Sequence, residues 1–150
     1  MPTRKLAAAK SRPHEKHSAP MKRVVAALIV KEGKILVCQR TKHQVMPLKW
    51  EFPGGKIEQG EEPHDALHRE LDEELGIDAT IGKEIARIKH TYKSGSAVEL
   101  RFFLVREYKG ELENRIFRDV QWAEAKRLPE FDFLEADLDL VNDLARGKLL

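Results

Sequence analysis

The pattern of apolar and polar residues changes abruptly about twenty residues into the chain. Residues 23–40 read RVVAALIVK, then a polar turn containing Gly33, then KILVCQR. Both runs are rich in β-branched residues, as is typical of two strands joined by a hairpin. The polar segment 41–49 predicts a loop, and WEF at 50–52 predicts a short strand that ends at Pro53-Gly54-Gly55.

The following segment has the period of a helix. Leu67, Leu71 and Leu75 recur at every fourth residue and form one apolar stripe. Pro63 suits the first helical turn, because N–H groups there have no hydrogen-bond partner within the helix and proline lacks this group. Gly76 suits the C-terminal end. The sequence therefore predicts a helix between these two residues.

The rest of the chain predicts more strands and one further helix. The expected elements are an extended region over 77–88, a hairpin over 89–108 with SGS at its tip, a strand at 120–125, a loop from Pro129 and a helix from about 136 to 145. Leu138, Val141 and Leu144 give that last helix its apolar stripe. The fold class expected from this order is α+β, with a mostly β core and two helices.

Two regions differ in composition. Residues 1–20 contain three prolines, five basic residues and one acidic residue, without periodic apolar positions. We expect them to form a flexible basic leader. Residues 21–150 then form one domain, because a chain of 150 residues that is 41% hydrophobic suffices for a single core.

Composition excludes several classes of protein. The net charge of +2 arises from the excess of basic over acidic residues in the leader. The domain itself is therefore not expected to bind nucleic acid. Cys38 is the one cysteine, which leaves no disulfide within the chain. The longest apolar run, residues 24–30, is far shorter than the ~18 residues of a membrane span. Because the leader also lacks the apolar core of a signal peptide, we expect a cytoplasmic protein without membrane contact. Whether it is a monomer or a dimer is left open.

The predicted helix 63–75 carries an unusual charge pattern. Glu70, Glu73 and Glu74 lie at i, i+3 and i+4 and so share one face, where like charges repel. Arg69 is the one Lys or Arg between Lys56 and Lys83. One interpretation is a solvated acidic face. The other is a site for a hard divalent cation such as Mg²⁺ or Mn²⁺, which prefers carboxylate and carbonyl oxygens.

The spacing of these residues resembles a known motif. Gly55, Glu61, Arg69-Glu70-Leu71, Glu73-Glu74 and Gly76-Ile77 match every fixed position of the Nudix box, G-x5-E-x7-R-E-U-x-E-E-x-G-U, in which U is a bulky aliphatic residue. KWEFPGGKIEQGE (49–61) is similar to the MutT-type branch of the Nudix hydrolases, which removes pyrophosphate from nucleoside triphosphates. The resemblance spans about residues 22–147. It implies the Nudix α/β/α sandwich, a mixed β-sheet between the box helix and a C-terminal helix.

The resemblance also implies roles for individual residues. Glu70, Glu73, Glu74 and the carbonyl of Gly54 are the expected ligands of Mg²⁺, for which Mn²⁺ can substitute. Glu70 and Glu73 are also the expected catalytic residues, together with Arg69, which orients the glutamates. Glu61 supports the start of the helix. The implied reaction is attack at the β-phosphorus of a nucleoside triphosphate, which releases nucleoside monophosphate and pyrophosphate.

One residue departs from the MutT-type pattern. Ile116 stands where related proteins often carry a loop glutamate that binds metal or acts as the base. An isoleucine has neither function. Glu113 and Asp119 are the nearby acids that could replace it, and otherwise a box glutamate, Glu70 or Glu73, must act as the base.

A second group of residues is implied to bind the substrate. By resemblance, Arg40 contacts the nucleotide, and Glu51, Phe52 and Pro53 line the same pocket. Lys56 either pairs with phosphate or lies on the surface. Asp137 either reads the base or is simply an acid at the start of a helix. These assigned residues are Arg40, Glu51, Phe52, Pro53, Lys56 and Asp137.

The chemistry of Asp137 limits which nucleobases it could bind but does not identify one. An ionised carboxylate only accepts hydrogen bonds, which suits N1–H and the 2-amino group of guanine and also the 4-amino group of cytosine. Asp137 does not separate 8-oxo-dGTP from cytosine nucleotides, and it is the resemblance to the MutT-type branch that implies a hydrolase that sanitises 8-oxo-dGTP. The alternatives are a CTP, dCTP or 5-substituted dCTP pyrophosphohydrolase, a dinucleoside polyphosphate hydrolase, and a catalytically silent module that senses a nucleotide.

Overall fold

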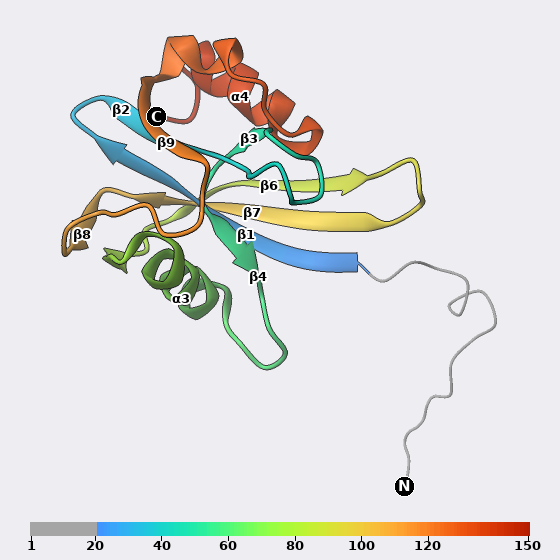
Figure 1. Cartoon of the computed structure of the whole chain (residues 1–150), viewed down its shortest axis with the longest axis horizontal. Helices are drawn as coiled ribbons and strands as arrows, with labels where there is room; N and C mark the ends of the chain where they lie inside the picture. The colour runs from blue at the N-terminus through green and yellow to red at the C-terminus, as the bar shows by residue number, and fades with distance from the viewer. Residues whose placement is uncertain (1–20) are drawn as a thin grey trace, which may run out of the picture.

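The computed structural model describes residues 21–150, in which a mixed β-sheet lies between helices on its two faces (Figure 1). The elements along the chain are β1 (Met21–Lys31), β2 (Lys34–Gln39), β3 (Trp50–Glu51), β4 (Gly54–Lys56), α3 (Pro63–Leu75), β5 (Asp78–Thr80), β6 (Glu84–Thr91), β7 (Ala97–Val105), β8 (Glu107–Lys109), β9 (Asp119–Glu124), the 3-10 helices η1 (Ala125–Glu130) and η2 (Glu135–Asp137), and α4 (Leu138–Ala145). The α+β sandwich expected from the sequence is confirmed. No helix within the described residues is long and apolar enough to cross a membrane.

The sheet is built around β1. Its order is β3-β2-β1-β7-β6, with β9 paired to β2 and β4 paired to β1. β1 and β7 run parallel from the Met21–Ala97 pair to the Ile29–Val105 pair, and the other pairings are antiparallel. β7 occupies one edge of β1. The other edge is shared by β2 and β4. β4 pairs with its first half and β2 with its end, so the two strands diverge between these points.

The continuous apolar run of β1 is explained by burial on both faces. Val25, Ala27 and Ile29 face α3, whereas Ala26 and Leu28 face α4. Each of these five side chains is 3% exposed or less. A strand covered on both sides reads as uninterrupted hydrophobic sequence rather than as an alternation.

The two α-helices cover opposite faces of the sheet (Figure 1). Leu67, Leu71 and Leu75 of α3 are fully buried, as the predicted stripe requires. Pro63 begins the helix, and Gly76 ends it with a left-handed φ of 69°, which glycine adopts without strain. On the other face, Leu140, Val141 and Leu144 of α4 pack against β1, β2 and β7.

Several local predictions from the sequence need correction. Leu138 is 44% exposed and Leu140 is buried in its place, because the buried face of α4 is centred on Leu140, Val141 and Leu144 and Leu138 lies away from it. The Gly54-Gly55 segment is not a simple turn but the strand β4. The segment 125–130, expected to include a loop from Pro129, is a 3-10 helix. The predicted leader at 1–20 lies outside the described residues.

Candidate active site

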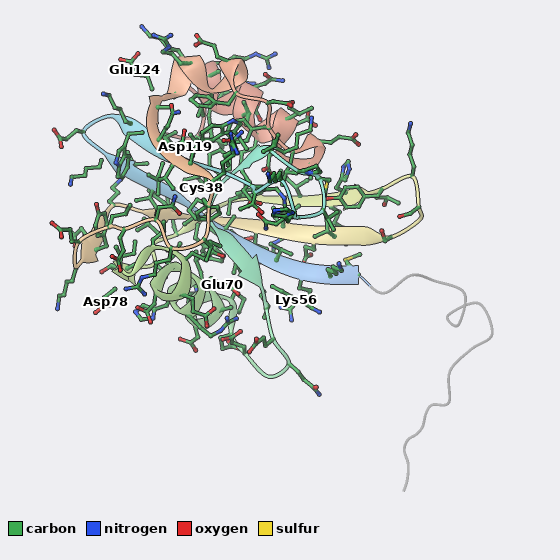
Figure 2. All side chains as sticks on the ribbon, viewed as in Figure 1. Cys38, Lys56, Glu70, Asp78, Asp119 and Glu124 are labelled. Atoms are coloured by element: carbon green, nitrogen blue, oxygen red, sulfur yellow. The ribbon has the colours of Figure 1, made fainter. Side chains whose placement is uncertain are left out.

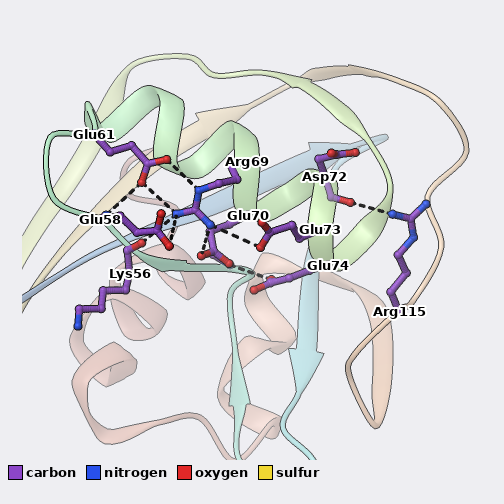
Figure 3. A network of polar contacts seen from close by, with 10 residues as sticks. Lys56, Glu58, Glu61, Arg69, Glu70, Asp72, Glu73, Glu74 and Arg115 are labelled. Atoms are coloured by element: carbon purple, nitrogen blue, oxygen red, sulfur yellow. Dashed lines mark hydrogen bonds and ion pairs between the residues drawn. The ribbon is translucent and has the colours of Figure 1, made fainter.

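Arg69 organises the acidic face of α3. Its Nε donates to Glu61 Oε2 at 2.8 Å and its Nη2 donates to Glu61 Oε1 at 3.0 Å. Nη1 donates to Glu70 Oε2 at 3.0 Å and lies 3.4 Å from Glu73 Oε1 (Figure 3). The hydrogen bonds from Arg69 lower the pKa of Glu61 to about 2, and Glu61 in turn raises the pKa of Arg69. The predicted orienting role of Arg69 is therefore consistent with its contacts.

Glu70 and Glu74 form a close pair of carboxyl groups beneath this arginine. Burial, a hydrogen bond to Glu70 and the negative charge of Glu70 raise the pKa of Glu74 to about 9. The pair lies against Gly55, where an added Cβ would stand 2.3 Å from Glu70 Cδ. Gly55 thus provides the space that the carboxyl group of Glu70 occupies, which explains the glycine that opens the motif.

Gly54 presents its backbone to the same carboxyl groups. Ala27 N–H donates to Pro53 O and Ile57 N–H donates to Arg23 O, both at 2.8 Å. In an antiparallel pair these bonds alternate along the strand, so the polar groups of Gly54 point away from β1. The N–H of Gly54 instead donates to Glu74 Oε1 at 3.3 Å. A side chain is excluded here because a Cβ would lie 2.0 Å from the carbonyl oxygen of Val25.

These groups suit a divalent cation chemically, although they are engaged with one another. Among residues 21–150, no three His, Cys, Asp or Glu side chains already stand in an arrangement that could hold a metal ion. Arg69 holds Glu70, and the side chain of Glu73 is 57% exposed beside it. Burial first, and then the hydrogen bond and charge of Glu70, raise the pKa of Glu74, and a bound cation would oppose that rise. The oxygen donors of Glu70, Glu73 and Glu74 are the kind that Mg²⁺ prefers.

A pocket of about 260 Å³ opens beside the glutamates, where β2 and β4 diverge from β1. Its walls come from strands on both sides of the divergence, from the loop before β9 and from η2. The lining residues are Val24, Val25, Ala26, Arg40, Gln44, Glu51, Phe52, Gly54, Gly55, Glu74, Leu100, Phe102, Ile116, Phe117, Leu134 and Asp137. The pocket thus joins the carboxyl face of α3 to the predicted base-reading residue.

Arg40 and Glu51 form an ion pair in the wall of this pocket. Arg40 Nη1 lies 3.0 Å from Glu51 Oε1, and each side chain is 18% exposed. Arg40 Nε also donates to the carbonyl of Val45 at 2.8 Å. Burial raises the pKa of Glu51, although the charge and hydrogen bond of Arg40 oppose the rise. The pair fixes the guanidinium in the wall of the pocket, and its contact with a nucleotide stays a prediction.

Asp137 is the most deeply buried charged residue of the pocket. It is 3% exposed, and its side chain makes no capping hydrogen bond at the start of α4. Burial, and secondarily the charge of Glu51, raise its pKa to about 7. A buried carboxyl group with a raised pKa is more typical of a binding site than of a helix cap.

The structure does not bring every predicted substrate residue into the pocket. Phe52 lines it, whereas Pro53 lies behind its wall and uses its carbonyl to bond Ala27. The side chain of Lys56 points away from the glutamates of α3 (Figure 3) and lines a separate depression with Lys22 and Arg23. Figure 2 shows Glu70 on α3 and Lys56 on the neighbouring β4.

Neither of the acids considered as replacements for Ile116 reaches the pocket. Glu113 pairs with Arg115, and Asp119 accepts hydrogen bonds at 2.8 Å from Val120 N–H and from the side chain of Gln121. Ile116 itself lines the pocket and is 46% exposed. The wall is therefore apolar where related proteins often carry an acid.

Sequence reasoning missed several lining residues. Gln44 lies in the polar loop 41–49, which has no periodic pattern, and its Oε1 accepts a hydrogen bond from Thr41 N–H at 2.7 Å. Phe117 and Leu134 belong to segments without regular structure. The contribution of these residues depends on long-range packing, for which a local pattern carries no signal.

Comparison with known proteins agrees with this architecture. The model of the NUDIX domain family matches residues 20–144. The CTP pyrophosphohydrolase of Escherichia coli (strain K12) is 36% identical over 119 residues, which cover 79% of this chain and 87% of that protein. The 8-oxo-dGTP diphosphatase of Haemophilus influenzae is 36% identical over 122 residues, covering 81% and 89%.

Solved structures give the same result. The solution structure of the E. coli ORF135 protein superposes with a TM-score of 0.75 at 35% sequence identity, covering 83% of this chain and 88% of that one. The crystal structure of the MutT NUDIX hydrolase from Burkholderia pseudomallei has a TM-score of 0.74 at 24% identity, covering 82% and 97%. The chain belongs to the NUDIX domain family. It is a Nudix hydrolase, an enzyme of the class that acts on phosphoric anhydride bonds.

Proposed function

We propose that this enzyme is a Mg²⁺-dependent nucleoside triphosphate pyrophosphohydrolase that releases nucleoside monophosphate and pyrophosphate, with 8-oxo-dGTP as its main substrate. The observation that carries the proposal is the single pocket that joins Gly54, Gly55 and Glu74 at one end to Asp137 at the other. A nucleotide bound with its base at Asp137 would place its phosphates beside the glutamates of α3. The relatives named 8-oxo-dGTP diphosphatase support the same substrate class.

The phosphate end of the pocket is suited to a metal ion. Glu70, Glu73, Glu74 and the carbonyl of Gly54 would hold one or more divalent cations, which supply charge neutralisation and activation of water when bound. Arg69 keeps the glutamates in place through its bonds to Glu61 and Glu70. Because Glu113 and Asp119 are engaged elsewhere, we assign the acceptance of the proton from the attacking water to a box glutamate, Glu70 or Glu73.

The base end is suited to guanine when Asp137 is ionised. The carboxylate then accepts hydrogen bonds from N1–H and the 2-amino group, which no pyrimidine edge supplies together. Ionised and neutral forms coexist near pH 7, because the pKa of Asp137 is raised to about 7. The burial of Asp137 means that an unmatched base leaves this group without a partner, which is a strong basis for selection.

A second substrate is favoured by the same residue. Neutral Asp137 has one O–H donor and one carbonyl acceptor, which match N3 and the 4-amino group of cytosine. The similarity to the CTP pyrophosphohydrolase of E. coli supports this alternative. CTP, dCTP and 5-substituted dCTP are therefore the second candidates.

The test is a pyrophosphate-release assay with Mg²⁺ over 8-oxo-dGTP, dGTP, CTP, dCTP and diadenosine polyphosphates. We expect the highest kcat/KM for 8-oxo-dGTP. Turnover of CTP or dCTP above it would favour the second candidate, and preferred turnover of diadenosine polyphosphates would replace both. No turnover of any of these nucleotides would contradict the proposal and favour a silent sensing module.

The site of attack is tested separately with ¹⁸O-labelled water. Attack at the β-phosphorus places the label in pyrophosphate, whereas attack at the α-phosphorus places it in the monophosphate. Glu70→Gln and Glu73→Gln should each lower kcat by at least about 100-fold. Loss of a residue that only supports a metal ligand costs about 10–100-fold, so loss of a ligand itself should cost at least the upper value. Asp65→Asn, which removes an exposed acid of the same helix, should leave kcat unchanged.

A further inference from the structure

The loop between β8 and β9 is bonded to the C-terminal end of α3. The N–H of Glu113 donates to the carbonyl of Leu75 at 2.9 Å, and the N–H of Arg115 donates to the carbonyl of Glu74 at 3.1 Å. These carbonyls belong to the last turn of the helix, where they have no partner within it. We call residues 111–118 the strap. It therefore caps the helix that carries the glutamates.

The side chain of Arg115 completes this cap. Its Nη1 donates to the carbonyl of Asp72 at 3.1 Å (Figure 3), and its Nε donates to Glu113 Oε1 at 2.7 Å, which fixes the guanidinium. An added Cβ on Gly76 would lie 2.7 Å from Arg115 Nη2, so the guanidinium occupies space that only glycine leaves free. The last turn of α3 has no basic residue of its own, and Arg115 supplies the cation that the negative helix end favours.

The residues that follow Arg115 form a wall of the substrate pocket. Ile116 and Phe117 both line it, and Phe117 is 8% exposed with its ring in the core beneath α3. Asn114 holds the turn from within, because its side chain exchanges two hydrogen bonds of 2.8 Å with the backbone of Phe117. The strap is thus a stiff connection between the end of α3 and one side of the pocket.

We propose that Arg115 is a positioning residue that sets the pocket wall at Ile116 for the nucleoside part of the substrate. This inference rests on the proposed function. Arg115 does not line the pocket and acts through its neighbours. Its contact with α3 holds Ile116 at a fixed place relative to Glu74, so that the apolar side chain packs against the sugar or base of a bound nucleotide. Loss of the contact lets the wall move away and weakens binding of the nucleoside.

The steady-state test compares Arg115→Ala, Ile116→Ala and the double variant. Each single variant should raise KM by roughly 5–30-fold and change kcat by less than about 3-fold, because Arg69 holds Glu70 through contacts that do not involve the strap. In the Ile116→Ala background, loss of Arg115 should raise KM by less than about 3-fold, because contacting residues that act together are not additive. Arg115→Lys should recover part of the loss. Additive effects in the double variant would overturn the proposal.

Arg127→Ala is the matched control. Arg127 forms an exposed ion pair with Glu130 at 3.1 Å, far from the strap, and its removal should leave KM and kcat unchanged. A merely structural effect of Arg115→Ala would lower the melting temperature and the fraction of active protein while KM stayed constant. That result would also overturn the proposal.

Hydrogen exchange separates this inference from the substrate assignment. Arg115→Ala should accelerate amide exchange in residues 111–118, and Arg127→Ala should not. This measurement needs no turnover, so it remains decisive if the wild-type enzyme hydrolyses none of the nucleotides tested. Unchanged exchange in the strap would refute the positioning role whatever the substrate is.

Discussion

Arg69 and Glu61 are joined by two parallel hydrogen bonds, from Nε to Oε2 at 2.8 Å and from Nη2 to Oε1 at 3.0 Å. The pair ties the start of α3 to the side chain that holds Glu70. Arg69→Lys should lower kcat by about 10–100-fold, because lysine cannot reproduce the planar two-donor contact, so Glu70 and Glu73, the proposed metal ligands, lose their orientation. Circular dichroism should show an intact fold. A kcat equal to that of the wild type would show that Arg69 is dispensable for orientation.

Glu74→Gln should separate stability from activity. Burial beside Glu70 raises the pKa of Glu74 to about 9, so near neutral pH the carboxyl group takes up a proton when the protein folds, which lowers stability. The amide is neutral in both states and avoids this cost, so the melting temperature without metal should rise. Addition of Mg²⁺ should stabilise the wild type more than the variant, and turnover should fall. An equal Mg²⁺-dependent shift in melting temperature for both proteins would contradict the assignment of Glu74 as a ligand.

Asp137→Asn should stabilise the protein in a pH-dependent way. The folded-state pKa of about 7 lies above the ordinary value of 3.8, so the folded state binds the proton more tightly and wild-type stability falls as pH rises between these values. The variant lacks this loss. It should be more stable than the wild type at pH 8 by on the order of 4 kcal/mol and much less so at pH 4. Chemical denaturation at both pH values measures the difference, with the exposed Asp139→Asn as control.

The same titration should affect the choice of base. The ionised form suits guanine and the neutral form suits cytosine, so the ratio of kcat/KM for 8-oxo-dGTP over CTP should rise as pH increases through about 7. Asp137→Asn should remove this dependence. A constant ratio between pH 6 and pH 8.5 in the wild type would exclude Asp137 as the residue that reads the base.

Arg40→Ala should destabilise the fold and weaken nucleotide binding together. The change leaves Glu51 without its partner in a site where both side chains are 18% exposed, which should cost about 2–3 kcal/mol in the free energy of unfolding. KM should rise because the guanidinium no longer faces the pocket. Lys49→Ala breaks the exposed ion pair with Asp132 and should cost less than about 1 kcal/mol. Equal losses in the two variants would show that burial of Glu51 has no energetic consequence.

Much of this architecture is predictable from the sequence because its signals are local. The stripe of Leu67, Leu71 and Leu75 defines the buried side of α3, and the spacing from Gly55 to Gly76 defines the motif. The apolar run of β1 likewise indicates burial on two faces. These features depend on neighbours in the sequence or on one regular element, so they can be read without tertiary structure.

The remaining features depend on contacts between distant segments. The strand β4 exists because Gly54 and Gly55 pair with Val25 and Ala26, some thirty residues earlier. The contacts of Arg115 with Asp72 and Gly76 join segments about forty residues apart, and no spacing rule connects them. The misplacement of Leu138 in the predicted core has a similar origin, because the packing of α4 on the sheet decides that the buried face includes Leu140 and not Leu138.

β2 and β4 pair with different parts of the same edge of β1, and this arrangement fixes the distance between the residues that the two strands carry. β2 leads to Arg40, whereas β4 presents Gly54, and both strands are anchored on the same rigid central strand. Under the proposed function, the register of β1 fixes the distance between Arg40 and the phosphate end of the pocket at Gly54. Substitutions of Asp137 on η2 should then alter which base is accepted without altering this distance.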